Sequence, residues 1–376
     1  MRVCHVCSGH STDDGRVFHR ACASLAASGY DVHLIATGAA TETYCDKGVA
    51  IHPLPKTGSR RERFARAAQV AQIAAEIKPD LFHVHEPELL GAVLSRSAGK
   101  PVVFDVHESY LDVLNERDWI PKPLRPLVRM MWDRRERGLV SRCAGVVVVT
   151  ERIAARYREM HKKIAIVGNY PNLSEFENLS PQPRDGRTCV FAGMLSPDRG
   201  LFEVITALGI LKKRGLSVPL ALAGMPTSDE YLETLLGEAK RQELGELVTY
   251  SGVLSKSEAI QFQNRGSIGL VPYLPVANSM ASMANKLLEG MALGLPLVFS
   301  NFPNYKEVAG ESGIAVDPTS PDEIANAIER LVTDPALAGQ LGSTGQRTVR
   351  ERLNWNVEYK KLLDLYQSIL GPVPAS

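Results

Sequence analysis

The sequence predicts an α/β protein built from two Rossmann-like domains that face each other across a cleft. Short apolar runs alternate with helical patterns along both halves of the chain, which is typical of parallel sheets covered by helices on both faces. The alternation stops in a polar, proline-bearing stretch at 169–187 and then starts again. The length of 376 residues also exceeds what one hydrophobic core usually serves.

The first domain is predicted over residues 1–170. Its expected strands are 2–7, 31–36, 81–85, 101–106, 145–150 and 163–168. Its expected helices are 16–28, 62–77, 88–98, 123–142 and 151–160. Because ligands of open α/β sheets bind beyond the carboxyl ends of the strands, the residues that follow each strand are the ones that can carry function.

A linker is predicted at 171–187 and a second Rossmann-like domain at 188–352. The expected strands of the second domain are 188–193, 219–224, 247–251, 267–272, 296–300 and 313–317. Helical patterns fill the gaps between these strands and continue through 321–333 and 335–352. The last segment, 353–376, contains a helical pattern at 355–370, and we expect this helix to return toward the first domain.

The composition is that of a globular protein, with 44% hydrophobic and 23% charged residues. No apolar run approaches the roughly 20 residues that span a bilayer, and the N-terminal run is too short for a signal peptide. The six cysteines are interpreted as buried thiols in a reducing compartment, so we expect a cytoplasmic protein. The net charge of +1 combines +6 over residues 1–170 with −5 over the remainder, which indicates either a solvated basic face or two halves with different partners.

The motifs give little support to a nicotinamide, ATP or metal site. The loop after the first strand, SGHSTDDGR, contains no G-x-G-x-x-G, and the chain contains no G-x-x-x-x-G-K-[ST]. Cys4 and Cys7 form a CxxC within a strand, where the odd spacing sends their side chains to opposite faces. No second CxxC, Asp-x-Asp or dense cluster of histidines and cysteines follows, so we expect no metal and no cofactor.

The stretch 283–300 places a lysine and a glutamate on a helix that a strand follows closely. Lys286 lies in the first helical turn, where free N–H groups and the helix dipole already favour a phosphate. Glu289 can accept hydrogen bonds from a ribose diol. The alternative is a surface ion pair between the two residues at i,i+3 spacing, which the spacing alone favours.

A second basic helix start occurs in FAGMLSPDRGLFEVITAL, residues 191–208. A predicted strand ends at Gly193, and Arg199 with Gly200 precedes a helix. A guanidinium there could bind a diphosphate through two hydrogen bonds. Two such helix starts in one domain support an anion site better than either does alone.

Several stretches together resemble the retaining glycosyltransferases of family 4, which have the GT-B fold. The run NKLLEGMALGLPLVFS resembles the signature of that family for the donor nucleotide, and GMLSPDRGLFEVITAL its phosphate-binding segment. LFHVHEPELL, VVFDVHES and RVFHRACASLAASGYDVHLIA look like segments of its N-terminal domain, and the tail is also similar. The resemblance covers nearly the whole chain, and the segment at 283–300 is its most specific part.

The resemblance implies that the second domain binds a nucleoside-diphosphate sugar. Arg199 and Lys286 would neutralise the diphosphate, Glu289 would hold the ribose, and His107 would face the donor sugar from the first domain. The catalytic candidates are therefore His107, Arg199 and Lys286. Further donor-site candidates are Gly193, Gly252, Val253, Asn285 and Leu287. Without the resemblance, His107 is better interpreted as a histidine satisfied at a strand end.

One position departs from the pattern of the family. A glutamate is expected eight positions before Glu289, where this chain has Ala281. The sugar hydroxyls would then be recognised by Asn278, Ser282 or Asn285 and by backbone amides. Acceptor-side or cleft candidates are Asp14, Gly15, Arg16, Glu86 and Glu108. For the loop that contains Asp14, the alternative is an exposed turn whose aspartate caps a helix.

The family implies a retaining, metal-independent transfer without a protein nucleophile, of the hexosyltransferase type, in bacterial surface polysaccharide or glycoconjugate assembly. The acceptor would be a glycan or a lipid-linked glycan, and no nucleic acid is expected. Segment 117–142 has eight basic and three acidic residues and an apolar stripe, so it either packs on its own sheet or touches anionic lipid on the inner face of the membrane. The alternatives to this function are an epimerase or inverting transferase of the same fold, or a non-catalytic nucleotide-sugar binding module.

Overall fold

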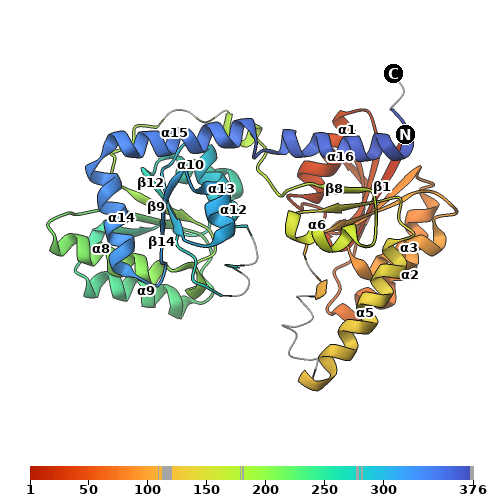
Figure 1. Cartoon of the computed structure of the whole chain (residues 1–376), viewed down its shortest axis with the longest axis horizontal. Helices are drawn as coiled ribbons and strands as arrows, with labels where there is room; N and C mark the ends of the chain where they lie inside the picture. The colour runs from red at the N-terminus through yellow and green to blue at the C-terminus, as the bar shows by residue number, and fades with distance from the viewer. Residues whose placement is uncertain are drawn as a thin grey trace. The chain divides into compact units, whose positions relative to one another are not determined.

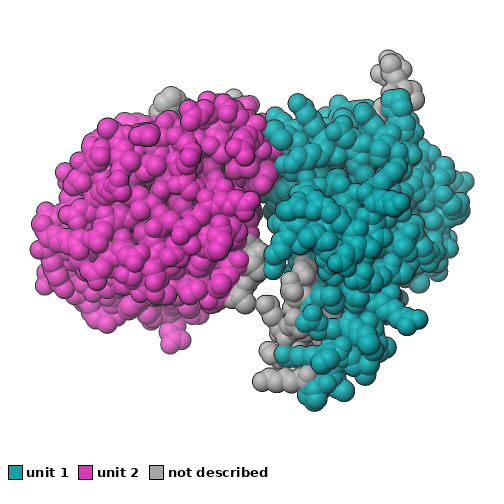
Figure 2. Space-filling view, in the orientation of Figure 1, with its two compact units in different colours: residues 1–169, 355–376 teal, residues 170–354 magenta. Residues whose placement is uncertain are grey.

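The computed structural model describes residues 1–108, 110–111, 121–177, 179, 182–276, 279–280 and 283–372, without the side chains of Arg60 and Lys122. The chain divides into two compact units (Figure 2). Unit 1 consists of Met1–Asn169 and Trp355–Ser376, and unit 2 consists of Tyr170–Asn354. Each unit is an α/β structure with a parallel sheet, so the predicted fold class is confirmed.

Unit 1 contains an eight-stranded sheet with the order β3-β4-β2-β1-β5-β6-β7-β8. The strands are β1 (Arg2–Ser11), β2 (Asp31–Thr37), β3 (Tyr44–Asp46), β4 (Val49–Leu54), β5 (Leu81–Val84), β6 (Val102–Val106), β7 (Gly145–Val148) and β8 (Ile164–Ile166). All neighbours pair in parallel except β3 and β4, which are antiparallel. The strand order reverses between β1 and β5, which is where open α/β sheets usually bind ligands.

The helices of unit 1 cover both faces of this sheet. They are η1 (Val17–Cys22, a π-helical segment), α1 (Ala23–Ala27), α2 (Arg60–Glu76), α3 (Pro87–Arg96), η2 (Lys122–Leu124), α5 (Arg125–Val140), α6 (Glu151–Arg158) and α16 (Trp355–Leu370). One core lies between the sheet and α2, α3, α5 and α6, and the other lies between the sheet and η1, α1 and α16. Cys4 faces the first core and Cys7 the second, as their odd spacing in β1 predicts.

The C-terminal helix α16 packs on unit 1 although residues 170–354 separate it from the rest of that unit (Figure 1). Trp355 Nε1 donates a hydrogen bond to Ser24 Oγ at 2.8 Å. Tyr366 is fully buried, and its hydroxyl lies 2.7 Å from His83 Nδ1. The last helix of the chain therefore completes the core of the first unit.

Unit 2 contains a six-stranded parallel sheet with the order β11-β10-β9-β12-β13-β14. The strands are β9 (Cys189–Ala192), β10 (Leu220–Ala223), β11 (Val248–Tyr250), β12 (Ile268–Val271), β13 (Leu297–Ser300) and β14 (Gly313–Val316). All residues of β9, β12 and β13, and all but one of β10, are buried, which explains the continuous apolar runs of these strands. Here the strand order reverses between β9 and β12, so the carboxyl ends of these two strands define the expected ligand crevice.

The described helices of unit 2 begin at recognisable signals. They are α7 (Ser174–Glu177), η3 (Pro197–Arg199), α8 (Leu201–Lys213), α9 (Asp229–Arg241), η4 (Gly245–Leu247), α10 (Lys256–Asn264), α12 (Asn285–Ala292), α13 (Pro303–Ala309), α14 (Pro321–Thr333) and α15 (Pro335–Glu351). Ser228 caps α9, Ser320 caps α14, and Ser255 forms a capping box with Glu258 on α10. The starts of α8 and α12 have no such side-chain cap.

The structure corrects three expectations. The predicted linker 171–187 belongs to unit 2, because Phe176 packs against its core and Arg184 donates to the carbonyl of Leu293 at 2.6 Å. The strands β3 and β4 were not expected, and they form a hairpin whose turn uses Lys47 at φ 48° and Gly48 at φ 75°. Cys45 is exposed, whereas the other five cysteines are buried.

None of the described helices is long and apolar enough to cross a bilayer.

Candidate functional site

Helix α12 presents Lys286 in its first turn, and Glu289 one turn further on, at the carboxyl edge of the unit 2 sheet. Lys286 Nζ lies 2.6 Å from Glu289 Oε2, so the surface pair that the spacing favoured is present. Gln263 Nε2 donates to the same carboxylate oxygen at 3.2 Å. The aliphatic part of Lys286 lies against Gly193 at the end of β9, where an added Cβ would be 3.4 Å from Lys286 Cε.

Arg199 is positioned by the tight turn that joins β9 to α8. Gly200 adopts the left-handed conformation with φ 67°, and a Cβ there would overlap the carbonyl oxygen of Pro272. Only glycine fits this position, since it tolerates positive φ and a close backbone approach. The turn places the Arg199 guanidinium over the ring of Tyr273, 4.2 Å from its centroid.

Tyr273 joins the two basic helix starts of unit 2. It follows β12 directly and is largely buried, and burial raises the pKa of its hydroxyl to about 12. The charge of Arg199 lowers this pKa and the charge of Glu289 raises it, so both groups act on the same ring. Arg199, just before α8, and Lys286, in α12, therefore both lie beyond the ends of β9 and β12, where the strand order reverses. The sequence did not single out Tyr273, although its place after an apolar strand is the available signal.

The remaining donor-site candidates differ in accessibility. Gly252 has φ 77° with open space where a Cβ would be, and Val253 beside it is exposed. Asn285 is exposed at the start of α12. Leu287 is completely buried in the core, so a ligand could reach only its backbone. Asn278, Ala281 and Ser282 lie outside the described residues.

In unit 1, His107 is the outermost member of a row of hydrogen-bonded histidines from three neighbouring strands. His5 Nδ1 lies 3.0 Å from His85 Nε2, and His85 Nδ1 lies 3.1 Å from His107 Nε2. The ring of His10 packs against His107 with centroids 4.8 Å apart. A neutral imidazole donates through one nitrogen and accepts through the other, so the tautomers in this row depend on one another. His107 is thus held through Nε2 at the end of β6, and its role toward a donor sugar stays a prediction.

Asp105 provides the negative charge beneath this row. Its Oδ2 lies 3.4 Å from His107 Nε2 and 3.5 Å from His85 Nδ1. Arg16 Nη2 lies 3.2 Å from Asp105 Oδ1, and Arg16 Nη1 donates to the carbonyl of Val167 at 3.0 Å. Burial alone would raise the pKa of Asp105, but Arg16 and His107 hold it well below its usual value. Burial lowers the pKa of His107, so the ring is neutral near pH 7.

The other first-domain candidates mainly organise the loop after β1. The carboxylate of Asp14 accepts from the N–H groups of Arg16 at 2.8 Å and Val17 at 2.7 Å, so it fixes the turn that leads into η1. Glu86 is buried and accepts from the N–H groups of residues 8–10, the shortest contact being 2.7 Å to Gly9. Gly15, in the same turn, accepts a hydrogen bond from Arg20 Nε. Glu108 is exposed after His107.

The histidines also include potential metal ligands. The ring nitrogens of His5, His83 and His85 lie within 4.8 Å of one another, and so do the ligand atoms of His85, Asp105 and His107. The expectation that histidines do not cluster is therefore wrong in space, because the strands that carry them are distant in sequence. Histidine and carboxylate are common zinc ligands, so independence from metals requires a direct test.

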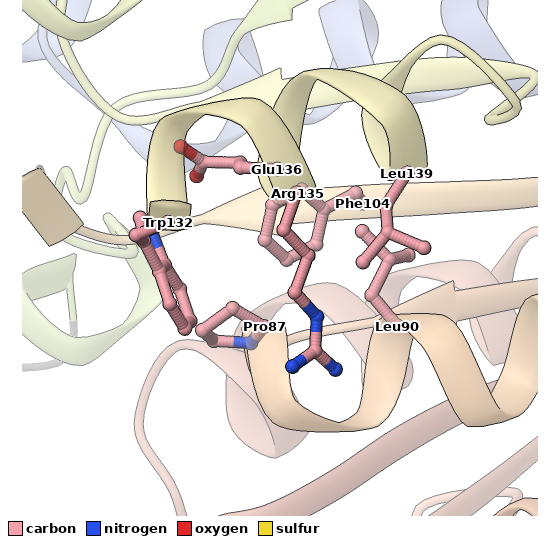
Figure 3. Close-up of a pocket in the computed structure, with 7 residues that line it drawn as sticks. All are labelled: Pro87, Leu90, Phe104, Trp132, Arg135, Glu136 and Leu139. Carbon is pink, nitrogen blue, oxygen red and sulfur yellow. The ribbon is translucent and has the colours of Figure 1, made fainter. Parts of the chain in front are cut away.

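The amphipathic segment of unit 1 is only partly packed. Trp132, Arg135, Glu136 and Leu139 of α5 surround a small cavity with Pro87 and Leu90 of α3 and Phe104 of β6 (Figure 3). Arg156 and the hydroxyl of Tyr157 both contact the Glu136 carboxylate. The other end of the helix is different, since Leu127, Met130 and Met131 are all at least half exposed. The predicted stripe therefore divides into a packed half and an exposed half.

Comparison with known families identifies the class of the protein as a glycosyltransferase. Residues 15–174 match the family described as Glycosyltransferase Family 4. Residues 174–348 match the family described as Glycosyl transferases group 1. The chain belongs to these glycosyltransferases, which confirms the resemblance inferred from its motifs.

Individual relatives are distant. The chain is 21% identical over 285 residues to a glycogen synthase of Mycobacterium tuberculosis, covering 74% of this chain and 66% of the relative, just under two thirds of its length. Sucrose-phosphate synthase from Thermosynechococcus elongatus superimposes with a TM-score of 0.74 at 19% identity over 98% of each chain. Anabaena HepE, solved in complex with UDP, gives a TM-score of 0.70 at 14% identity, covering 98% of this chain and 100% of that one. At these identities the structural likeness establishes the GT-B fold alone.

Proposed function

We propose that the protein is a retaining, metal-independent glycosyltransferase that transfers a sugar from a nucleoside-diphosphate sugar to a glycan or lipid-linked acceptor in bacterial surface polysaccharide or glycoconjugate assembly. One observation carries the proposal. Two helices without side-chain caps, α8 and α12, start beside Arg199 and Lys286 where the strand order of unit 2 reverses. Free N–H groups and two cations at that place suit a diphosphate.

The donor would bind to unit 2. Arg199 and Lys286 would hold the diphosphate, and Glu289 would accept hydrogen bonds from the ribose. The exposed backbone at Gly252 and Val253 would lie against the base. The UDP bound to the structurally similar HepE supports a nucleoside diphosphate as the ligand class, and the base of this donor is left to experiment.

The chemistry follows from the charge that develops on the leaving group. When the bond between the anomeric carbon and the diphosphate breaks, negative charge grows on the phosphate while the sugar becomes oxocarbenium-like. Preorganised cations and helix N–H groups stabilise this charge more than the ground state, which lowers the barrier. The acceptor hydroxyl would attack on the face that the phosphate leaves and give its proton to that phosphate. His107 would position the donor sugar as a neutral imidazole.

The acceptor would bind to unit 1. The exposed half of α5 combines apolar side chains with a basic sequence, so it suits contact with an anionic membrane that carries a lipid-linked acceptor. Such contact would make the protein a peripheral one on the inner face of the cell membrane.

The test is release of free nucleotide from a panel of UDP-, GDP- and ADP-sugars, with each donor first ranked by thermal shift. Transfer should persist in EDTA, and NMR of the product should show the anomeric configuration of the donor. Binding without release would instead indicate a binding module. Inverted product would indicate an inverting transferase, and loss of activity in EDTA restored by a metal would remove the claim of metal independence.

A further inference from the structure

A second cavity of unit 1 lies between Ser8 of β1 and helix α2. Its volume is about 140 Å³, and Ser8, Thr37, Thr57, Arg63, Arg66 and Gln69 provide the polar part of its lining. Its lining includes Thr37 and Leu54, the last residues of β2 and β4, so it lies at the carboxyl edge of the sheet, where ligands of open α/β sheets bind. Guanidinium, amide and hydroxyl donors line it, and none of the described residues in its lining carries a carboxylate.

The helix that supplies the two arginines carries its charge at the unfavourable end. All four arginines of α2 occur in its first seven residues. Cations near a helix N-terminus are destabilising because the dipole there is positive. An anion bound between Arg63 and Arg66 would compensate both the side chains and the helix end.

The two arginines are not equally neutralised within the protein. Arg63 Nε lies 3.7 Å from Glu88 Oε1. Arg66 Nη1 donates to the carbonyl of Pro55 at 3.2 Å, and among the described residues it has no carboxylate partner. Gly9 leaves room for this arrangement, because a Cβ there would overlap Nη1 of Arg63.

Ser8 gives an independent indication of a ligand. It is 4% exposed and lines the cavity, and its hydroxyl makes no hydrogen bond with any residue that the structure describes. A buried hydroxyl without a partner costs free energy, so such groups are usually satisfied by a ligand or by water.

Three consecutive residues, Ser8, Gly9 and His10, connect the cavity to the row formed by His5, His85 and His107. The N–H groups of Ser8, Gly9 and His10 all donate to Glu86. Ser8 lines the cavity, while the ring of His10 packs on His107. A group bound in the cavity is therefore anchored close to the residue assigned to the donor sugar.

We propose that this cavity binds a phosphoryl group of the acceptor, an inference that rests on the proposed transferase function. Three phosphoryl oxygens can accept from two guanidinium groups and from the Ser8 hydroxyl together. The acceptor is then a phosphorylated molecule, either a soluble glycosyl phosphate or a glycan linked to lipid through phosphate.

The test uses the whole chain with its donor site filled by the nucleoside diphosphate that gives the largest thermal shift. Inorganic phosphate is titrated at constant ionic strength while tryptophan fluorescence follows unfolding. All three tryptophans, at 119, 132 and 355, belong to unit 1, so the signal reports the unit that contains the cavity. The variants are Arg63→Gln/Arg66→Gln and Ser8→Ala, and Arg61→Gln on the same helix is the matched control.

Phosphate should raise the melting temperature of the wild type and of Arg61→Gln. In the double arginine variant its apparent affinity should fall at least about tenfold, and Ser8→Ala should show a smaller loss. If glucose 1-phosphate competes with inorganic phosphate for the cavity, the acceptor is soluble. If only phosphatidic acid vesicles compete with inorganic phosphate, the acceptor is linked to lipid. An equal phosphate effect in all variants, or none in the wild type, overturns the proposal. Nucleotide binding and donor hydrolysis, measured in the same variants, report separately on the transferase function.

Discussion

Lys286, in the first turn of α12, forms an ion pair with Glu289, three residues further along the helix, with 2.6 Å between Nζ and Oε2. Lys286, assigned to the diphosphate, and Glu289, assigned to the ribose, therefore contact each other directly. Gln263 donates to the same carboxylate oxygen, so Glu289 has a second anchor when Lys286 turns toward a phosphate. Lys286 and Glu289 can thus form an ion pair in the free protein and still bind the donor.

Replacing Lys286 by alanine should lower kcat/KM for the donor by about 100-fold or more. The lysine would stabilise charge that appears on the leaving group in the transition state, and one such group typically contributes about 3 kcal/mol. Lys213→Ala, at the last turn of α8, is the matched control and should leave the rate unchanged. Intact turnover in Lys286→Ala would remove this residue from the site.

Glu289→Ala should abolish discrimination between ribose and dideoxyribose. In the wild type, a nucleoside diphosphate without the 2′ and 3′ hydroxyls should bind more weakly, by about 1.5–3 kcal/mol for hydrogen bonds to a charged group. In the variant, both nucleotides should bind with the same reduced affinity. Calorimetric titration of both ligands to both proteins gives the coupling, and a difference that persists in the variant would place the ribose elsewhere.

Asp105→Asn should destabilise unit 1 by about 3–5 kcal/mol, because it leaves the buried Arg16 guanidinium without its counter-charge. The double variant Arg16→Met/Asp105→Asn should cost clearly less than the sum of the single variants. Urea denaturation followed by tryptophan fluorescence measures all four proteins, since every tryptophan belongs to unit 1. Additive effects would show that the two residues do not interact.

Unit 1 should lose stability as the pH falls from about 7 toward 5. Burial lowers the pKa of His5, His85 and His107, whereas the unfolded chain protonates its histidines near pH 6.5. Below that pH these histidines bind protons in the unfolded state but stay neutral in the folded state. The free energy of unfolding therefore decreases as the pH falls. His10 acts in the opposite direction. Burial is the largest single effect and lowers its pKa, but the hydrogen bond to Asp14 and the nearby carboxylate charges together raise the pKa above its usual value.

Hydrogen exchange by peptide, corrected for the intrinsic effect of pH, provides the comparison. Unit 2 contains none of the nine histidines, so its protection should change less than that of unit 1 over this range. Equal losses in both units would show that the buried histidines do not control the acid sensitivity.

The sequence predicted the elements of the fold well where one pattern decides them. Nearly continuous apolar runs indicated the strands of both sheets, and Lys286 and Arg199 were found because helix starts after strands are visible in sequence. The hairpin of β3 and β4 was missed, because β3 has only three residues, all exposed, and His52 and Pro53 interrupt the apolar run of β4.

The contacts that organise unit 1 could not be predicted in the same way. His5, His85 and His107 meet only because β1, β5 and β6 are neighbours, and Arg16 meets Asp105 across 89 positions of sequence. Glu86 resembled a cleft carboxylate, but most of its hydrogen-bonding capacity serves the N–H groups of residues 8–10. The type of a residue and its position after a strand predict which edge of the sheet carries a site. The residues that it contacts there depend on the order of the strands in the sheet, which the sequence pattern does not show.

The position of α16 has a consequence for biosynthesis. Trp355 and Tyr366 fill the core of unit 1, yet a ribosome makes them only after all of unit 2 has been translated. During synthesis, residues 1–169 therefore form an incomplete intermediate whose apolar surface stays partly uncovered until α16 leaves the ribosome. Expression of residues 1–169 alone should yield an aggregation-prone fragment, and supplying the missing helix as a separate peptide should rescue its solubility.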